Sequence, residues 1–420
     1  MGNFKYDVGV IGLGYVGLPL AIQATDSNLN VYGYDIDEDK VNSFNLGKSA
    51  IEDISDAELQ KSLEKGLFLS SDPKYLSDSE TIVISVPTPL TDYQPDLSYV
   101  RSAAETIAKH LTKNQIIILE STTYPGTTIE VLIPVIEEIS HQKAGVDFYV
   151  GYSPERIDPG NEKWNFKNTP KVISGINDES LTKIKTFYEK IIDQVVTVSG
   201  TKEAEMVKLL ENTYRHVNIA LINELAILCN MLEIDIWEVV NAAKTKPFGF
   251  ESFRPGPGVG GHCIPVDPNY LSFKTRQIGK PVRFVELAQE INNSMPSYVV
   301  SRLLEKMNLL EKPFKNSNIL ILGVAYKKDI SDVRESPAIG IIENLYDKGV
   351  NVKYFDPFVE KIVVNNQGVE REESLDNLNN YDLILVHTAH TDFESFDFSK
   401  TEVPIFDATG SNHYKNAERI

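Results

Sequence analysis

The first twenty residues contain the feature that most restricts how this chain can fold. An apolar run, Tyr6 to Ile11, leads directly into the sequence Gly12-Leu13-Gly14-Tyr15-Val16-Gly17, after which a helical pattern begins. A strand, a glycine-rich turn and a helix in this order are typical of a Rossmann-like βαβ unit. A second apolar segment, Val31 to Tyr34, follows this helix and ends at Asp35. The start of the chain therefore predicts a parallel α/β sheet.

The same turn predicts a dinucleotide site. Glycine permits the tight turn and lets a pyrophosphate approach the amide groups at the helix N-terminus. Asp35 is expected to accept a hydrogen bond from the ribose 2′-hydroxyl. Its charge would repel a 2′-phosphate, so NAD is expected rather than NADP. The residues expected to contact the cofactor are Gly12, Gly14, Tyr15, Val16, Gly17, Asp35, Pro87, Thr88 and Thr122.

Two segments that directly follow later predicted strands are also expected to contact the dinucleotide. The sequence Val86-Pro87-Thr88-Pro89 follows an apolar strand, and ligands of parallel sheets bind at the C-terminal ends of strands. A rigid strand exit is the alternative, because each proline restricts the residue before it. The segment Glu120 to Gly126 occupies the equivalent place one strand later. A hydroxyl there could face the nicotinamide or cap a helix.

Short apolar strands alternate with helical patterns at both ends of the chain. After the first strands, further candidates are found at residues 81–86, 115–120, 147–151 and 171–174, and again at 318–323, 352–356, 381–386 and 403–407. This alternation predicts an α/β fold with two Rossmann-like, doubly wound parallel-sheet domains, joined by a long central helix and a helical middle domain. The expected boundaries are 1–200 for the NAD-binding domain, 201–312 for the central domain and 313–420 for the C-terminal domain.

The central helix is expected to run from Lys202 to about Leu232. This stretch contains no Gly or Pro, and its apolar residues recur at helical spacing. It is much longer than the average helix of about 11–12 residues. More helix is expected at residues 236–243 and 281–307. A helical middle of this length is expected to form a hinge and the surface of a homodimer or higher homo-oligomer.

The C-terminal Rossmann-like domain lacks the glycine fingerprint. Instead, Lys327, Lys328 and Arg334 follow its first strand, where a phosphate would lie. The whole chain has 41 Lys and Arg against 60 Asp and Glu, a net charge of −19. In such an acidic chain three neighbouring cations indicate a local anion site, although a solvated loop of mixed charge is the alternative.

The acidic composition also argues against nucleic-acid or membrane-surface partners. No apolar run approaches the length of a membrane span, and no secretory signal is recognisable. Only Cys229 and Cys263 are present, too few for a disulfide framework. Sparse cysteine fits a reducing compartment, so the cytoplasm is the expected location. Cys229 lies in an apolar helical pattern and is interpreted as a packing residue.

Cys263 lies in a very different context. The sequence from Pro255 to Asp267 is dense in Gly and Pro, which favours a shaped loop that displays the thiol. A structural thiol would need apolar neighbours, and a metal ligand would need a partner at Cys-x-x-Cys spacing. His387 and His390 are isolated from it in the sequence, so no metal site is expected. A nucleophile is the remaining interpretation, if a helix N-terminus or a lysine lowers its pKa.

Four other residues are candidates for chemistry. Glu155 follows a strand and is interpreted as a general base or as the partner of Arg156 or another cation in an ion pair. Asp267 could orient a water or hold the cysteine loop. Lys208 and Asn212 stand four residues apart and so share one helix face, where they could stabilise an oxyanion. From spacing alone a solvated face would be the better interpretation of this last pair.

The whole chain resembles the UDP-glucose/GDP-mannose dehydrogenase family. The most specific matches are Gly12 to Leu20, Val86 to Pro89, Ser153 to Arg156, Lys208 to Asn212, Gly260 to Asp267 and Gly323 to Pro337. The runs at residues 153–161, 245–250 and 258–265 resemble the bacterial UDP-N-acetylhexosamine 6-dehydrogenases. The resemblance implies four-electron oxidation of a UDP-sugar at C6, with two NAD molecules reduced per sugar, for surface polysaccharide synthesis.

The resemblance also implies roles for individual residues. Cys263 would form a thiohemiacetal and then a thioester, Lys208 and Asn212 would stabilise the oxyanion, and Thr122 would help to place a water. Either Glu155 or Asp267 would activate that water. The residues implied to bind the UDP-sugar are Glu155, Arg156, Lys208, Asn212, Arg254, Gly260, Lys327 and Arg334.

One position departs from the family pattern. Many UDP-glucose enzymes have a second glutamate four residues after the first, and here that position is Pro159. This favours UDP-N-acetylglucosamine, with Arg156 and Pro159 shaping the pocket for an N-acetyl group. UDP-glucose and UDP-N-acetylmannosamine are the alternative substrates. A two-electron Rossmann dehydrogenase and an inactive NAD-binding regulatory protein are the alternative functions.

Overall fold

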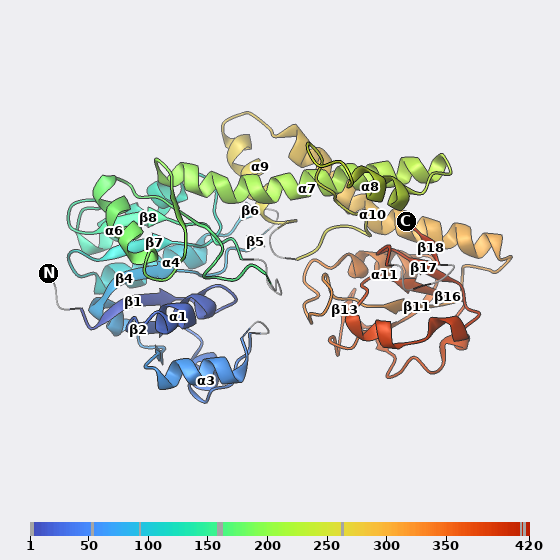
Figure 1. Cartoon of the computed structure of the whole chain (residues 1–420), viewed down its shortest axis with the longest axis horizontal. Helices are drawn as coiled ribbons and strands as arrows, with labels where there is room; N and C mark the ends of the chain where they lie inside the picture. Colours follow the sequence, from blue (N-terminus) through green and yellow to red (C-terminus); the bar gives the residue numbers. More distant parts are fainter. Residues whose placement is uncertain are drawn as a thin grey trace. The chain divides into compact units, whose positions relative to one another are not determined.

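The computed structural model describes residues 4–51, 54–91, 94–157, 163–261, 264–411, 414 and 417–420. The chain forms two compact units (Figure 1). The N-terminal unit comprises Met1–Glu211 and Asn269–Lys280, and the C-terminal unit comprises Asn212–Pro268 and Pro281–Ile420.

The N-terminal unit is built on a six-stranded sheet with the order β3-β2-β1-β4-β7-β8. All of its neighbouring strands pair in parallel, which confirms the predicted doubly wound sheet. The strands are β1 (Tyr6–Ile11), β2 (Val31–Tyr34), β3 (Phe68–Ser70), β4 (Ser79–Ile84), β7 (Ile116–Leu119) and β8 (Tyr149–Tyr152). Strands β2 and β3 are added on one side of β1 and the later strands on its other side, so the strand order switches between β1 and β4. A ligand crevice is expected at the C-terminal ends of these two strands.

Helices connect these strands, as the alternating pattern predicts. They are α1 (Gly17–Asp26), α2 (Glu38–Asn45), α3 (Asp56–Glu64), α4 (Ser98–His110), α5 (Ile133–Ser140) and α6 (Asp178–Tyr188). The segment expected as a strand at residues 171–174 is β9 (Lys171–Ile173). It pairs with β10 (Val195–Thr197) in a separate two-stranded sheet and not with the main sheet.

The long central helix is confirmed as α7 (Thr201–Met231). It is followed by α8 (Ile236–Ala243), α9 (Asp267–Gln277) and α10 (Arg283–Leu309). Helix α9 was not expected from the sequence, which placed Asp267 in a loop. Asp and Pro are favoured in the first turn of a helix, and the Gly- and Pro-rich run before Asp267 obscured this signal.

The C-terminal unit contains the second six-stranded sheet, with the order β15-β12-β11-β16-β17-β18. Its neighbouring strands are also parallel. The strands are β11 (Asn318–Leu322), β12 (Asn351–Phe355), β15 (Glu370–Arg371), β16 (Leu383–Val386), β17 (Ile405–Asp407) and β18 (Glu418–Arg419). Helix α11 (Pro337–Asp347) packs with α10 on buried apolar side chains that include Val299, Leu303 and Ile341. The sheet confirms the second predicted Rossmann-like unit.

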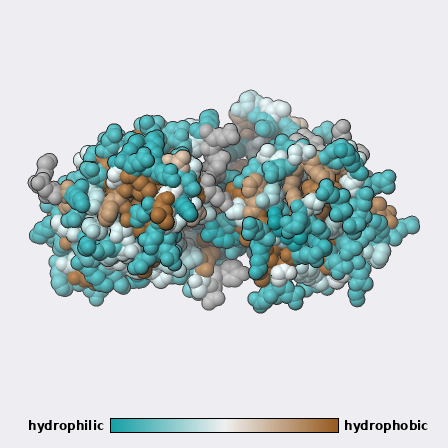
Figure 2. Space-filling model, turned by 90° about the horizontal axis from the view of Figure 1, so that it is seen from below, coloured by the Kyte–Doolittle hydropathy of each residue, from teal (hydrophilic) through white to brown (hydrophobic). Residues whose placement is uncertain are grey.

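The remaining strands form small hairpins: β5 (Leu90–Thr91) with β6 (Gln94–Pro95), and β13 (Val363–Val364) with β14 (Gln367–Gly368). Hydrophilic side chains cover most of the face seen in Figure 2, with apolar side chains gathered in a few patches. Among the described residues, no helix combines the length and the apolar character that crossing a bilayer requires.

Candidate active site

The turn between β1 and α1 has the shape that a pyrophosphate requires. Gly12 adopts φ +89°, which favours glycine, and a Cβ on Gly17 would lie 1.8 Å from the Gly12 carbonyl oxygen. A Cβ on Gly14, in contrast, would meet no heavy atom of the described chain within 4 Å. No side chain of the described residues caps the start of α1. The turn therefore presents an open space at the N-terminus of α1, the positive end of the helix dipole, and this fits an anion.

Asp35 lies at the end of β2 and faces this turn. Its Oδ2 accepts hydrogen bonds from the Leu13 amide at 2.8 Å and from Lys40 Nζ at 2.8 Å, and its Oδ1 accepts from the Asp37 amide at 3.1 Å. A carboxylate offers about four acceptor positions, so one remains for a ribose hydroxyl. The sequence pattern identified Asp35 but missed Lys40, which orients it.

Replacing Gly14 with alanine is expected to weaken NAD binding at least about tenfold without unfolding the protein, because the added methyl fills only the space that the pyrophosphate needs. Replacing Gly17 with alanine is expected to destabilise the N-terminal unit, because its Cβ would also lie 2.4 Å from Ser85 Oγ. Calorimetric titration with NAD and thermal unfolding would separate the two outcomes. Unchanged NAD affinity in the Gly14 variant would contradict this assignment.

The neighbouring strand exits carry the other predicted cofactor residues. Pro87 is exposed, and the Thr88 carbonyl accepts a 2.7 Å hydrogen bond from the Tyr270 hydroxyl of α9. Thr122 is half-buried. The next hydroxyl, on Thr123, is fully buried and has no hydrogen-bond partner among the described residues. The sequence offered no way to distinguish these two threonines.

Glu155 follows β8 and is clamped by donors on both carboxylate oxygens. Its Oε1 accepts from the Arg156 and Ile157 amides, each at 2.7 Å, and its Oε2 accepts from Lys171 Nζ at 3.0 Å. Lys171 Nζ also lies 3.0 Å from Glu120 Oε1, and the Tyr188 hydroxyl donates to the same oxygen. All four side chains of this cluster are buried, which the sequence alone does not reveal.

The two carboxyl groups of this cluster differ in their electrostatics. Burial opposes ionisation of Glu155, but the Lys171 ammonium and the backbone donors outweigh it and lower the pKa of Glu155. For Glu120 burial prevails over the attraction of Lys171 and raises the pKa. Glu155 is therefore held as a carboxylate, whereas the carboxyl group of Glu120 is less acidic than that of a free glutamate.

The segment after β8 is tied to two other elements. Arg156 donates to the Pro170 carbonyl at 2.6 Å and to Glu211 Oε1 of α7 at 2.6 Å. Lys208 Nζ, also on α7, donates to the Glu155 carbonyl at 2.7 Å. The guanidinium of Arg156 thus pairs with Glu211 and not with Glu155. Pro159 lies outside the described residues.

Helix α7 carries both members of the predicted Lys/Asn pair. Lys208 and Asn212 are each less than a tenth exposed, so this face of α7 is not a solvated one. Asn212 Nδ2 donates to Asp267 Oδ2 at the start of α9, within the C-terminal unit. The structure therefore joins Asn212 with Asp267 and Lys208 with Glu155. Both contacts link residues more than fifty positions apart.

The predicted nucleophile Cys263 and its neighbour His262 lie outside the described residues. The glycines just before them are described, and they pack on the loop after β11. A Cβ on Gly260 would lie 2.7 Å from the Tyr326 Cβ, and the Gly261 amide donates to the Arg334 carbonyl at 3.2 Å. The structure thus brings Gly260 next to the predicted anion-binding loop. Arg254 is exposed upstream.

The cations of that loop have acidic neighbours. Arg334, 55% exposed, donates to Asp332 through Nε and Nη2 at 2.8–3.2 Å, and Lys328 pairs with Glu394 at 3.1 Å. Lys327 is half-buried. Arg334 and Lys328 are both exposed, and exposed ion pairs contribute little free energy. Either cation could therefore exchange its carboxylate partner for a phosphate at a small cost in free energy.

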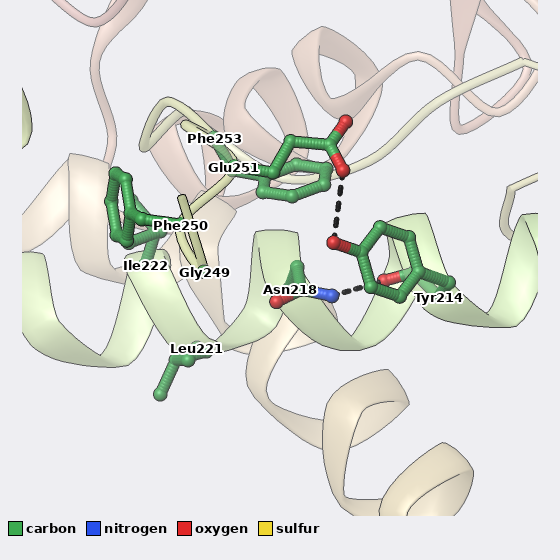
Figure 3. Close-up of a pocket in the computed structure, with 8 residues that line it drawn as sticks. All are labelled: Tyr214, Asn218, Leu221, Ile222, Gly249, Phe250, Glu251 and Phe253. Carbon is green, nitrogen blue, oxygen red and sulfur yellow. Dashed lines mark hydrogen bonds between the residues drawn. The ribbon is translucent and has the colours of Figure 1, made fainter. Parts of the chain in front are cut away.

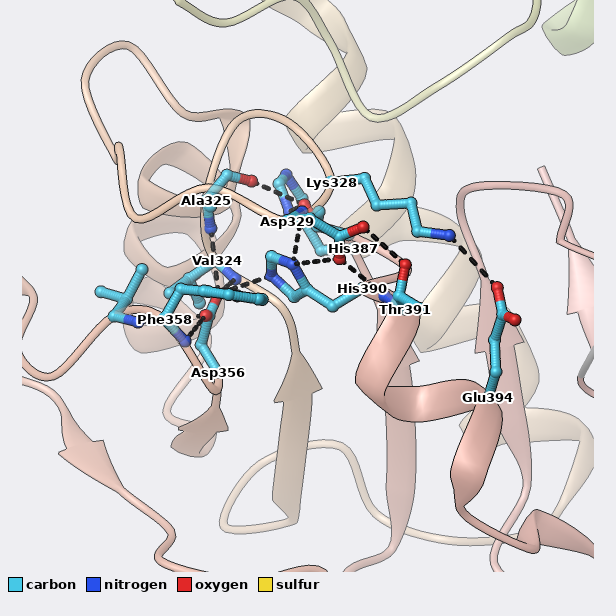
Figure 4. Close-up of polar contacts among 12 residues, drawn as sticks. Val324, Ala325, Lys328, Asp329, Asp356, Phe358, His387, His390, Thr391 and Glu394 are labelled. Carbon is cyan, nitrogen blue, oxygen red and sulfur yellow. Dashed lines mark hydrogen bonds and ion pairs between the residues drawn. The ribbon is translucent and has the colours of Figure 1, made fainter. Parts of the chain in front are cut away.

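Figure 4 shows the polar contacts at the end of β12, in the second Rossmann-like unit. Asp356 occupies the place of Asp35 and accepts from the Val324 and Ala325 amides at 2.7 and 3.2 Å. Its Oδ2 also lies 3.0 Å from His390 Nε2, while His390 Nδ1 accepts from the Asp329 amide at 2.9 Å. In the second unit an imidazole thus contacts the aspartate that corresponds to Asp35.

His390 was interpreted from the sequence as an isolated histidine, and its structural role was missed. Its two ring nitrogens are both engaged, which fixes the neutral tautomer with the proton on Nε2. Across the described part of the chain, no group of three or more His, Cys, Asp or Glu side chains is arranged for a metal ion.

Three segments match models of one protein family. Residues 6–192 match the NAD binding domain of the UDP-glucose/GDP-mannose dehydrogenase family, residues 202–294 match its central domain, and residues 320–410 match its UDP binding domain. The chain belongs to this family. It is therefore an NAD-dependent nucleotide-sugar dehydrogenase.

Individual relatives in the family agree with this assignment. The chain is 36% identical over 390 residues to the UDP-N-acetyl-D-glucosamine 6-dehydrogenase of Pseudomonas aeruginosa, covering 92% of this chain and 91% of the relative. It is 33% identical to the UDP-N-acetyl-D-mannosamine dehydrogenase of Pyrococcus horikoshii, covering 93% and 91%. The solved structure of the UDP-D-ManNAc dehydrogenase from the same organism superposes with a TM-score of 0.88 at 32% identity, covering 98% of this chain and 96% of that one.

Within this dehydrogenase, the stability of the C-terminal unit is expected to fall below neutral pH. Burial lowers the pKa of His216 and of His387 from 6.5 to about 4. The unfolded chain therefore binds more protons between pH 6.5 and 4, so acidification favours unfolding. Between pH 7 and pH 5 each histidine is expected to remove about 2 kcal/mol from the free energy of unfolding.

Tryptophan fluorescence offers a direct measurement of this effect. Trp237 is buried in the C-terminal unit, while Trp164 is exposed in the N-terminal unit. In a Trp164→Phe background, urea unfolding followed at Trp237 would report on the C-terminal unit alone. His387→Gln should flatten the pH dependence, and an unchanged slope would disprove the contribution of His387.

Proposed function

We propose that this dehydrogenase oxidises the C6 alcohol of UDP-N-acetylglucosamine to the uronic acid in a four-electron reaction, and that the product supplies surface polysaccharide synthesis in the cytoplasm. The observation that carries the proposal is the buried polar face of α7. Lys208 and Asn212 are held there by the Glu155 carbonyl and by Asp267. A buried ammonium and amide one helical turn apart suit an oxyanion better than they suit packing.

The proposed reaction has three steps. The C6 carbon first gives a hydride to NAD and its hydroxyl loses a proton, which leaves an aldehyde. The thiol of Cys263 adds to the aldehyde carbon while a proton reaches the carbonyl oxygen, which gives a thiohemiacetal. The C6 hydride of this adduct then goes to a second NAD and its hydroxyl loses a proton, which leaves a thioester. Water then displaces the thiol and releases the carboxylate. Each sugar thus yields two NADH.

The structure supports a choice between the two candidate bases for the water. Both carboxylate oxygens of Glu155 are occupied by buried donors. A carboxylate held in this way is a poor proton acceptor, because protonation would break the contact with Lys171. We therefore assign activation of the water to Asp267 as the general base. Asn212 would orient the Asp267 carboxylate, and Thr122 would place the water. Glu155 is assigned to binding and positioning.

At the other end of the substrate, the UDP group is assigned to the C-terminal domain. Lys327 and Arg334 lie on the loop after β11, where a phosphate meets the end of a parallel strand. Gly260 packs on the same loop, and this contact connects the cysteine segment with the nucleotide site. Exposed Arg254 would reach a phosphate or the sugar. The domain division at residues 1–200, 201–312 and 313–420 is part of the proposal.

A homodimer through α7 is also proposed. Apolar side chains that are more than a third exposed recur along this helix at Tyr214, Leu221, Leu225, Leu228 and Met231. Their spacing of three, four or seven places them on one face. Two residues of this stripe, Tyr214 and Leu221, also line an open pocket together with Phe250 and Phe253 (Figure 3). An apolar stripe of this extent marks a protein interface.

The test is to count NADH for each sugar consumed over a panel of UDP-hexoses and UDP-N-acetylhexosamines. Two NADH per UDP-N-acetylglucosamine, with the highest kcat/KM on that sugar, are expected. One NADH per sugar would identify a two-electron enzyme. Comparable turnover of UDP-glucose would contradict the proposed N-acetyl selectivity, including the contribution of Arg156 and Pro159. No turnover on any sugar of the panel would favour a regulatory NAD-binding protein.

A further inference from the structure

Lys171 is a buried cation that the proposed reaction does not use. It is the first residue of β9, its side chain is only 4% exposed, and its Nζ lies 3.0 Å from one carboxylate oxygen of Glu120 and 3.0 Å from one of Glu155. The ammonium also lies 5.3 Å from the centre of the Phe166 ring and 5.6 Å from that of Tyr188. Burying a lysine is costly unless its partners hold it firmly, as they do here.

The contacts of Glu155 lead from Lys171 to the proposed active site. Its carboxylate is fixed by Lys171 on one oxygen and by two backbone amides on the other. Its own backbone carbonyl accepts the Lys208 ammonium at 2.7 Å. If the carboxylate were released, the peptide group after Glu155 could rotate, and Lys208 would lose the acceptor that fixes its ammonium.

We propose that Lys171 is a positioning residue that holds the Lys208 ammonium in place through Glu155. This inference rests on the proposed function, because it assigns Lys171 a part in the reaction that Lys208 assists. All the residues concerned belong to the N-terminal unit.

The charge of the cluster agrees with this role. Lys171 is held charged, since the attraction of Glu120 and Glu155 outweighs its burial and raises its pKa. Glu155 balances that charge as a carboxylate. Burial raises the pKa of Glu120, and its Oε2 has no hydrogen-bond partner in the described part of the chain. The ion pair of Lys171 with Glu155 connects β9 with the segment after β8, and Glu120 Oε1 contacts the same ammonium from the end of β7.

Removing Lys171 alone would leave two carboxyl groups buried without a cation, and the variant would risk failing to fold. The test therefore uses a Glu120→Gln background, which removes one acid and keeps its size. In that background Lys171→Met is expected to lower kcat about 10²-fold, the loss that a small misplacement of a catalytic group produces. NAD affinity is expected to stay the same, since the glycine turn is untouched.

A double-mutant cycle with Lys208→Ala separates positioning from general destabilisation. If Lys171 acts through Lys208, Lys171→Met will cause no further loss of kcat once Lys208 is absent. Equal losses with and without Lys208 would overturn the inference, and so would an unchanged kcat. Arg302→Met provides a matched control, because Arg302 is another buried cation, paired with Glu418 in the C-terminal unit. It should lower stability without lowering kcat.

A measurement that needs no turnover distinguishes failure of this inference from failure of the proposed function. Reductive methylation of Lys208, followed by peptide mass spectrometry, reports how firmly its ammonium is held. Lys171→Met in the Glu120→Gln background is expected to speed this methylation about tenfold or more, while Lys74, at 60% exposure, reacts as before. An unchanged rate at Lys208 would overturn the inference. A wild-type protein without dehydrogenase activity would overturn only the proposed function.

Discussion

A Cys263→Ser variant is expected to stop after the first oxidation and to produce no uronic acid. The serine hydroxyl is a far weaker nucleophile than a thiolate, so the aldehyde would not be captured as a covalent adduct. Formation of the uronic acid is expected to fall by at least about 10³-fold, the scale of loss when a covalent nucleophile is removed. Mass spectrometry of the sugar products and the number of NADH per sugar would measure both effects.

The second cysteine provides the control for this experiment. Cys229 lies on α7 in a partly buried position beside the apolar core of the C-terminal unit. Cys229→Ser should keep two NADH per sugar, because packing alone is affected. If Cys263→Ser formed uronic acid at a rate close to that of the natural enzyme, the covalent mechanism would be wrong.

Replacement of Lys208 by alanine is the change with the second largest expected effect. The ammonium lies 2.7 Å from the Glu155 carbonyl in a buried setting, where a charge stabilises a developing oxyanion much more than it would in water. Loss of one such donor is expected to lower kcat by about 10²- to 10³-fold. Steady-state kinetics with UDP-N-acetylglucosamine, combined with NAD binding measurements, would show whether kcat alone changes.

Lys202 is the matched control for Lys208, because it lies on the first turn of the same helix. Its side chain is 56% exposed and only 3.9 Å from Glu130, which describes a weak surface pair. Lys202→Ala should leave kcat unchanged. A Lys208→Ala enzyme with the natural kcat and a raised KM would show that the ammonium serves binding and not the transition state.

The features that sequence predicts well here are those that local patterns determine. The glycine turn with Asp35, the parallel strands and the full length of α7 all depend on neighbours within one element or one βαβ unit. Their bounds agree with the structure to within a few residues. The glycine turn and Asp35, where the dinucleotide is expected to bind, could therefore be located before any coordinates were known.

The features that sequence did not predict depend on pairs of residues distant along the chain. Lys171 is 16 positions from Glu155, and His390 is 34 positions from Asp356. Nothing in their immediate neighbours shows that they are buried or what they contact. The same holds for the assignment of β9 to a separate sheet. Which strands pair depends on tertiary contacts, and the β-propensity of a segment does not determine it.

The start of α1 links the cofactor to the fold itself. Within the described residues this helix begins without a side-chain cap, and the Leu18 and Leu20 amides donate to the Gly14 and Val16 carbonyls instead. A pyrophosphate bound at this turn would place its negative charge at the positive end of α1, and the dinucleotide would then stabilise the secondary structure of its own binding domain. A ligand at a hundred times its dissociation constant raises the free energy of unfolding by about 2.7 kcal/mol. The stability of the folded enzyme is therefore expected to rise with the NAD concentration around it.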